Sequence, residues 1–132
     1  MDGAFIKERG KMKADKIFDT VIGLMFSDQK DKSNYESMFC PILNLITAEC
    51  FTVNNILRRR NELEPLTEIP FAEDLEDDIP YEDEMLRKIM PYGIAAQLYS
   101  EDDENGITNV YREKYMQMLL EIGYAEFMEA EE

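Results

Sequence analysis

The sequence predicts an all-α fold, a compact bundle of about four main helices that forms a single helical domain over residues 1–132. Apolar residues recur at spacings of three and four in several separate segments, as they do on the buried face of a helix. No segment alternates apolar and polar residues over the length that a half-buried strand needs. A chain of 132 residues also buries about two-thirds of its unfolded surface, which is enough for a real core.

Two helices are expected in the first half of the chain. The first is predicted from Lys13 to Phe26, followed by an exposed polar loop from Ser27 to Asn34. Ser33 or Asn34 is then expected to cap the second helix, which begins at Tyr35. The apolar positions of this second helix are Met38, Phe39, Ile42, Leu45, Ile46, Cys50, Val53, Ile56 and Leu57.

Prolines are expected to bend two of the helices. Pro41 lies inside the second helix, where it removes a backbone donor and presses on the preceding turn. A kink or short break is therefore predicted from Phe39 to Pro41. Pro91 has the same effect in the third helix, which is predicted to start at Pro80 with Asp78 as its N-cap.

A face with little bulk is predicted on the third helix. Ile89, Gly93 and Ala96 follow helical spacing, so another helix can approach closely there. The polar segment from Ser100 to Asn105 then reverses the chain, and the fourth helix is predicted from Thr108 to Phe127.

An acidic linker, residues 62–80, joins the second and third helices. It contains three prolines, and its apolar residues follow no helical or strand spacing, so an extended segment is expected. From Asn61 to Leu86 the chain carries eleven carboxylates and neither lysine nor arginine. We interpret these acids mainly as solvated surface, with weak cation binding and carboxylate catalysis as the alternatives.

The composition excludes most catalytic chemistry. Histidine is absent, which removes the commonest general base and metal ligand. The six glycines are scattered and form no phosphate-binding loop. We therefore expect no enzyme activity, no metal and no cofactor. Specific nucleic-acid binding is not expected either, because 29 acidic residues face only 14 basic ones and the net charge is −15.

Cysteine usage and hydropathy indicate where the protein is made. Cys40 and Cys50 are predicted on one helix about 15 Å apart, too far for a disulfide, so both are expected to be reduced core thiols. No apolar run approaches the roughly 20 residues of a membrane span, and no signal peptide is recognisable. We expect synthesis in the cytosol and no membrane partner.

Three pieces of the chain resemble the pattern of head-tail connector (adaptor) proteins of long-tailed bacteriophages and prophages. They are CPILNLITAE at Cys40–Glu49, the acidic linker leading into IPYEDEMLRKIMPYGIAA at Ile79–Ala96, and the SEDDEN turn before NVYREKYMQMLLE. The resemblance implies a structural protein of the virion neck, assembled in the bacterial cytoplasm. It also implies a ring-shaped homo-oligomer that docks between the portal and neck or tail proteins. The residues before Met12 fall outside the pattern, and residues 1–12 are a candidate disordered extension.

The candidate site residues are charged or aromatic. Near the end of the second helix, Arg58, Arg59 and Arg60 either complement the helix dipole or pair with the acidic segment of a neighbouring subunit. The acidic strip is expected at a subunit interface or along the DNA passage, and comprises Glu73, Asp74, Glu76, Asp77 and Asp78. Gly123 is expected to end or loosen the fourth helix, and the candidates for docking a partner after it are Tyr124, Phe127 and Met128.

A second functional hypothesis comes from the acidity alone. A chain that arrays carboxylates at phosphate-like spacing can mimic DNA and inhibit a DNA-binding enzyme. The proline-interrupted linker and the cluster Arg58–Arg60 argue against this alternative, because they disturb a regular array of negative charge. A DNA mimic would be a monomer or dimer that competes with DNA, whereas a connector forms rings.

Overall fold

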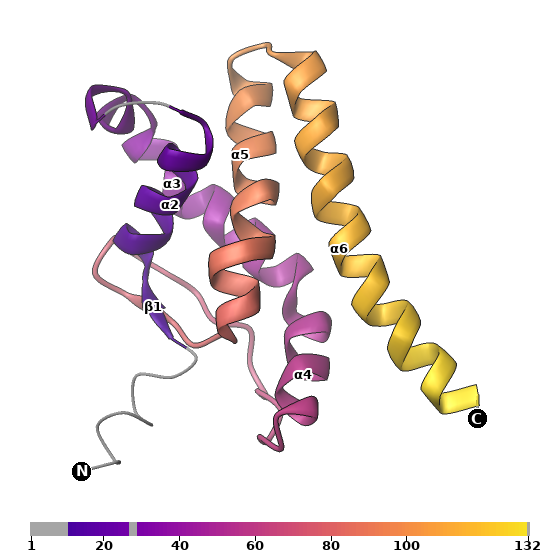
Figure 1. The fold of residues 1–132 in the computed structure, drawn as a ribbon. Helices are drawn as coiled ribbons and strands as arrows, with labels where there is room; N and C mark the ends of the chain where they lie inside the picture. Colours follow the sequence, from indigo (N-terminus) through magenta and orange to yellow (C-terminus); the bar gives the residue numbers. More distant parts are fainter. Residues whose placement is uncertain (1–10, 27–28, 132) are drawn as a thin grey trace.

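The computed structural model describes residues 11–26 and 29–131, and these form an all-α bundle with one very small sheet. The elements are β1 (Met12–Lys13), α2 (Ala14–Leu24), α3 (Gln29–Glu49), α4 (Phe51–Arg60), β2 (Asp78–Ile79), the π-helical turn η1 (Met85–Ile89), α5 (Met90–Glu101) and α6 (Asn105–Glu131) (Figure 1). The predicted all-α class is confirmed. The second predicted helix corresponds to α3 and α4 together, and the third to η1 and α5.

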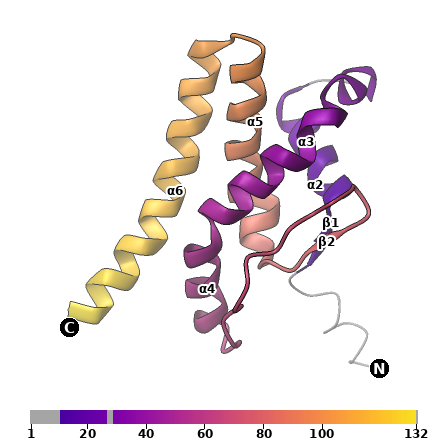
Figure 2. The same ribbon diagram turned by 180° about the vertical axis from the view of Figure 1, so that it is seen from behind.

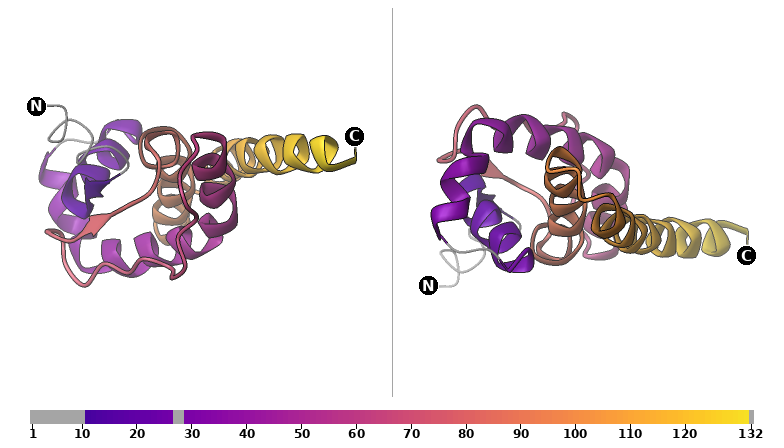
Figure 3. Two further views of the ribbon diagram at one scale, coloured as in Figure 1. Left: turned by 90° about the horizontal axis from the view of Figure 1, so that it is seen from below. Right: turned by 90° about the horizontal axis from the view of Figure 1, so that it is seen from above.

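The helix α5 is central to the bundle. It lies between α2 and α6 in Figure 1, with α3 and α4 behind it. The expected reversal after α5 is confirmed, because α6 returns antiparallel and the Glu104 N–H donates to the Tyr99 carbonyl at 2.9 Å. Seen from behind, the linker runs beside α4 and then α3 before it reaches β2 (Figure 2). The C-terminal part of α6 extends beyond the other helices (Figure 3).

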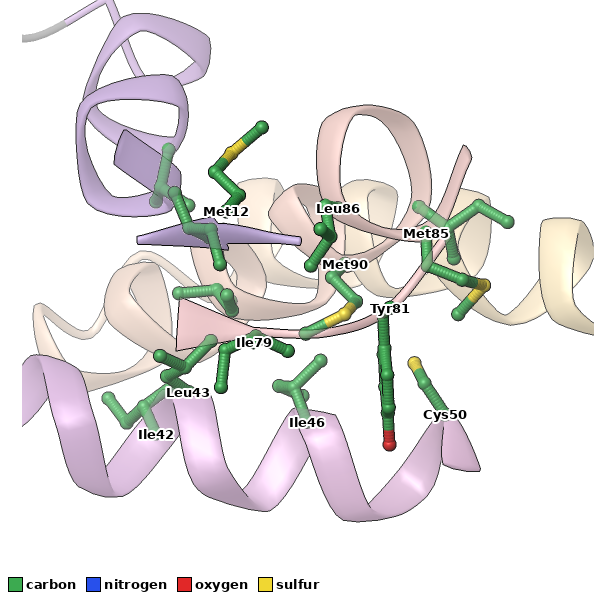
Figure 4. Packing of buried hydrophobic residues seen from close by; sticks show 14 of the residues in the cluster. Met12, Ile42, Leu43, Ile46, Cys50, Ile79, Tyr81, Met85, Leu86 and Met90 are labelled. Carbon is green, nitrogen blue, oxygen red and sulfur yellow. The ribbon is translucent and has the colours of Figure 1, made fainter. Parts of the chain in front are cut away.

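The core lies where α3 faces β2 and the start of α5. Figure 4 shows Leu43 and Ile46 of α3 pointing toward Ile79 of β2. Strand β1 pairs antiparallel with β2, which places Met12 opposite Ile79. Met12 is only 8% exposed, so the candidate extension stops short of it, and residues 1–10 lie outside the described part of the chain.

The predicted loop from Ser27 to Asn34 is wrong over most of its length, because α3 begins at Gln29. Ser33 and Asn34 therefore lie inside a helix and do not cap one. Lys32 shows why this polar segment is ordered. Its Nζ donates to Asp15 Oδ1 at 2.8 Å and to Asp19 Oδ1 at 2.6 Å, both on α2. These tertiary ion pairs hold a segment that is too polar to be fixed by apolar burial.

The interruption in the second predicted helix occurs at Cys50, whereas α3 is uninterrupted through Pro41. The segments Lys32–Glu49 and Phe51–Arg60 meet at an angle of 58°. The hydroxyl of Tyr81 donates to the Thr47 carbonyl at 2.6 Å, and this carbonyl would accept the Phe51 N–H in an uninterrupted helix. Tyr81, the residue directly after the linker, thus supplies the polar group that accompanies the bend.

The third helix starts later than predicted. Asp78 does not cap it, because Asp78 belongs to β2, where it pairs with Lys13. The Glu82 carbonyl instead accepts the N–H groups of Met85 and Leu86 at 2.9 and 3.1 Å. The Met90 N–H donates five residues back to Met85, so a wide π turn comes directly before Pro91, which lies in the first turn of α5.

The predicted small-residue face is used for packing between α5 and α6. Gly93 and Ala96 are buried, and Tyr115 of α6 is fully buried against Gly93. An aromatic ring, rather than a second backbone, therefore fills the space. The helix α6 runs from Asn105 to Glu131, so Gly123 does not end it.

Candidate functional site

The acidic strip forms an ordered loop. Asp77 Oδ2 accepts the backbone N–H groups of Glu73 at 2.7 Å and of Asp74 at 3.2 Å, and Asp74 Oδ1 accepts that of Glu76 at 2.8 Å. The carbonyls of Leu75 and Asp77 accept the N–H groups of Asp15 and Ala14, at the start of α2. Two acids of the strip thus shape a loop that caps α2, and this internal role was not predicted from the sequence.

The strip nevertheless presents charge to solvent, as predicted. Glu73, Asp74, Glu76 and Asp78 are exposed, and Asp77 is half-buried. Glu76 pairs with Lys13 at 2.8 Å, but both side chains are more than half exposed, so this pair contributes little stability. The loop hydrogen bonds use the carboxylates of Asp74 and Asp77 as acceptors, and the carboxylates of Glu73, Glu76 and Asp78 are not among the acceptors of these bonds.

The structure does not bring the three arginines to the strip. Arg58 Nε donates to the Glu64 carbonyl at 2.6 Å, and its Nη1 lies 3.8 Å from Glu82 Oε2. Arg60 Nη2 donates to the Ile122 carbonyl at 3.3 Å, which ties α4 to α6. Arg59 is exposed. Two of the three predicted interface arginines therefore make contacts within their own chain.

A single buried carboxylate lies beside a small pocket of about 160 Å³, lined by Leu57, Asn61, Glu82, Asp83 and Glu84. Glu82 is 4% exposed, and its Oε1 accepts a hydrogen bond from Asn61 Nδ2 at 2.7 Å. Asp83 and Glu84 are exposed, so the pocket has no pair of buried acids. Within residues 11–26 and 29–131, no group of three or more cysteine, aspartate or glutamate side chains is placed to hold a metal ion.

Cys50 and Tyr115 meet in the core between α3 and α6. The Tyr115 hydroxyl donates to Glu49 Oε1 at 2.8 Å and lies 3.3 Å from Cys50 Sγ. Burial raises the pKa of the Cys50 thiol to about 12, so the thiol stays protonated near neutral pH and is a poor nucleophile. Cys40 is also a free thiol. As predicted, no disulfide joins the two cysteines; Cys50 lies in the core, whereas Cys40 is only partly buried.

A groove lined by three basic residues and one acidic residue, Glu121, surrounds Tyr92. It consists of two adjoining hollows of about 310 Å³ each, which share Lys88 and Tyr92. Arg87 lines the first hollow and Lys114 the second, where the Lys114 Nζ lies 5.4 Å from the centre of the Tyr92 ring. We call this the Tyr92 groove. It was not predicted, because its lysines are far apart in the sequence.

A larger apolar groove lies between α4 and α6, and we call it the α4–α6 groove. Its volume is about 890 Å³, and it is lined by Val53, Glu113, Met116, Gln117, Leu119, Leu120, Glu121, Gly123 and Tyr124. The predicted docking residue Tyr124 belongs to it. The side chains of Phe127 and Met128 lie outside the part of the chain that the structure describes. Met116 and Leu120 were missed, although their spacing of four from each other and from Tyr124 is visible in the sequence.

No protein-family model matches the chain, and comparisons with curated proteins and with solved structures found no match. In the described part of the chain, no single helix has the length and hydropathy of a membrane span. The bent pair Lys32–Glu49 and Phe51–Arg60 passes the same test only when its two helices are taken together.

Proposed function

We propose that this protein is a structural head-tail connector of a long-tailed bacteriophage or prophage. In this role, identical subunits form a ring at the neck of the virion, between the portal and the neck or tail proteins. The subunits are made in the bacterial cytoplasm and join the particle during assembly. The proposal needs no enzyme activity and no cofactor.

The observation that carries the proposal is the separation of charge on the surface. The acidic strip is exposed at the end of the linker, on the side of α3 that Figure 2 presents. The Tyr92 groove, with Arg87, Lys88 and Lys114, is formed by α2, η1, α5 and α6, and these helices face the viewer in Figure 1. Complementary patches at different places on one subunit support a head-to-tail contact, which closes into a ring when its rotation allows.

The structure changes which cations we assign to this contact. Arg58 and Arg60 are already engaged within the subunit, so they are poor partners for a neighbour. Lys88 and Lys114 are exposed beside the Tyr92 groove, whose two hollows of about 310 Å³ each can receive acidic side chains of a loop. We therefore propose that the acidic strip of one subunit lies in the Tyr92 groove of the next.

The test is assembly in the presence of the portal protein encoded by the same genome, followed by electron microscopy and mass measurement of the complexes. Rings are expected at low salt and should weaken as the Debye length falls from about 10 Å to about 3 Å. Glu73→Lys with Glu76→Lys should abolish rings, since both positions face the neighbour and leave the hydrogen bonds of Asp74 and Asp77 intact. Lys88→Glu with Lys114→Glu should do the same, and mixing the two variant proteins should restore the contact between them.

Three other outcomes would replace the proposal. Intact rings in the Glu73/Glu76 variant with impaired DNA passage would place the strip along the lumen, where negative walls avoid holding phosphates. A monomer or dimer that competes with DNA for a nuclease would favour the DNA-mimic hypothesis. Wild-type assembly and infectivity in every variant would leave the strip as surface charge that serves solubility.

A further inference from the structure

The α4–α6 groove exposes an apolar stripe that the fold itself does not cover. Met116, Leu120 and Tyr124 are 40%, 65% and 64% exposed, although each is large and apolar or aromatic. They are successive residues at a spacing of four, so they form one line along α6 over about 12 Å. Val53 of α4 supplies the opposite wall. This shape matches the grooves that receive the apolar face of an amphipathic helix.

Among the residues that line the groove, all the charged side chains are acidic. Glu113 and Glu121 line it, and the remaining polar lining residue is the neutral Gln117. Neither lysine nor arginine is among the residues that line the groove. Carboxylates beside an apolar stripe attract a partner whose apolar face is flanked by lysine or arginine, and they repel an acidic one.

The same charge argues against a second copy of this chain as the occupant. Each copy carries a formal net charge of −15, so two copies repel each other at long range. Pairing two α6 stripes face to face would also bring Glu113 and Glu121 of both copies into one contact. Like charges at the rim of an apolar contact oppose it. A cationic helix removes this repulsion while it covers the same apolar residues.

We propose that the α4–α6 groove is a docking site for a cationic amphipathic helix of another protein. The groove accepts apolar side chains at helical spacing against Met116, Leu120 and Tyr124, while Glu113 and Glu121 pair with basic residues on the flanks of that helix. The α4–α6 groove shares Gln117 and Glu121 with the Tyr92 groove, but Met116, Leu120 and Tyr124 do not line the Tyr92 groove. The apolar part of this docking site can therefore be tested apart from ring formation.

The experiment measures the binding of two labelled peptides to the full chain by fluorescence anisotropy. Both peptides are 18-residue amphipathic helices with the same leucine face, and their polar face is lysine in one and glutamate in the other. We expect the lysine peptide to bind and the glutamate peptide not to bind. Binding should weaken as salt shortens the Debye length from about 10 Å to about 3 Å. Backbone amide shifts in NMR spectra should map the lysine peptide to α4 and the second half of α6.

Matched variants separate the apolar and the electrostatic parts of the contact. Leu120→Ser with Tyr124→Ser should weaken the lysine peptide about tenfold or more, as removal of central apolar anchors does. The control is Val110→Ser, which is also on α6 and 53% exposed but lies outside the groove. Glu113→Gln with Glu121→Gln should weaken binding by a few-fold and flatten its salt dependence, whereas Glu101→Gln at the exposed C-terminal end of α5 should do neither.

Several results would overturn the docking site. Equal binding of both peptides, or binding of neither, would contradict the proposed charge preference. Unchanged binding of the lysine peptide to the Leu120/Tyr124 variant would indicate attraction to the acidic surface in general. A dimer of the peptide-free chain that the Leu120/Tyr124 variant abolishes would assign the groove to a second copy. A chain that loses the peptide but still forms rings with the portal shows that the docking site and the ring are separate properties, so each proposal can fail without the other.

Discussion

The ring of Tyr115 occupies the space that any side chain at position 93 would need. A Cβ built on Gly93 would lie 2.8 Å from Tyr115 Cε1 and 2.9 Å from two further ring atoms. The ring cannot easily move away, because Tyr115 is fully buried and its hydroxyl is held by Glu49. This contact joins α5 and α6 and depends on the absence of a Cβ at position 93.

Gly93→Ala should therefore destabilise the protein. Overpacking of a filled core costs about 1–3 kcal/mol, which exceeds the gain of up to about 1 kcal/mol from replacing a helical glycine by alanine. Urea unfolding followed by circular dichroism measures the difference. The matched control is Gly123→Ala in α6, where a Cβ meets nothing within 4 Å, and we expect it to stabilise the chain. Equal stabilisation by both changes would contradict the packing argument.

Asn44→Ala should loosen the linker. Asn44 Nδ2 donates to the Ala72 carbonyl at 2.9 Å, and Asn44 Oδ1 accepts the Ala72 N–H at 2.8 Å, so one amide satisfies both backbone groups of a residue that is 1% exposed. Leaving them without partners costs about 1–3 kcal/mol. Urea unfolding and faster hydrogen exchange at the Ala72 amide check this.

The control for that change is Asn109→Ala on the exposed side of α6. It should stay within about 0.5 kcal/mol of the wild type, as surface substitutions usually do. If both variants lost the same stability, the linker would not be held by Asn44 in solution.

Local periodicity was enough to predict where helices form, but not where they begin, bend and end. The apolar spacing that predicts α2, α3, α4, α5 and α6 is a property of neighbouring residues. The start of α3 depends on the ion pair between Lys32 and Asp15 of α2. The bend at Cys50 coincides with the hydrogen bond from the Tyr81 hydroxyl to the Thr47 carbonyl. Such contacts join residues 17 and 34 positions apart, and no spacing rule indicates them.

The candidate site was predictable to a similar extent. Tyr124 and the acidic strip were candidates from the sequence, because amphipathic spacing and charge runs are visible there, and the structure leaves Tyr124 and most of these acids exposed. The internal roles of Arg58 and Arg60 were not, since their acceptors are backbone carbonyls, which every residue has. The Tyr92 groove was missed because only the fold brings Lys88 beside Lys114.

Within the acidic strip, the residues are not equivalent. Asp77→Ala removes the acceptor of the Glu73 and Asp74 N–H groups, so the loop that caps α2 should loosen at a cost of about 1 kcal/mol. Glu73→Ala removes an exposed carboxylate and should change stability by less than about 0.5 kcal/mol. Urea unfolding ranks the two variants, and hydrogen exchange at the amides of Ala14 and Asp15 reports on the cap. The opposite ranking would mean that the loop geometry does not matter to the fold.

Because the Cys50 thiol is buried, the free energy of unfolding should fall at alkaline pH. Burial raises the pKa of its thiol from the ordinary value of 9.0 to about 12 in the folded protein. Below pH 9 both states keep the proton, so the contribution is fully present there. Between pH 9 and about 12 the unfolded chain loses the proton that the folded chain retains, and the free energy of unfolding falls by up to about 1.4 kcal/mol per pH unit.

Urea unfolding at several pH values from 7.5 to about 10 tests this. The thiol loses its proton first in the unfolded chain, and the buried tyrosines, whose unfolded pKa is about 10, add to the decline toward the upper end of that range. Cys50→Ala should flatten the decline between pH 9 and 10, even though it lowers stability at pH 7.5 by leaving a cavity. Cys40→Ala is the comparison, since that thiol is only half-buried and should leave more of the decline in place. A decline of unchanged slope in the Cys50 variant would show that another group governs the alkaline transition.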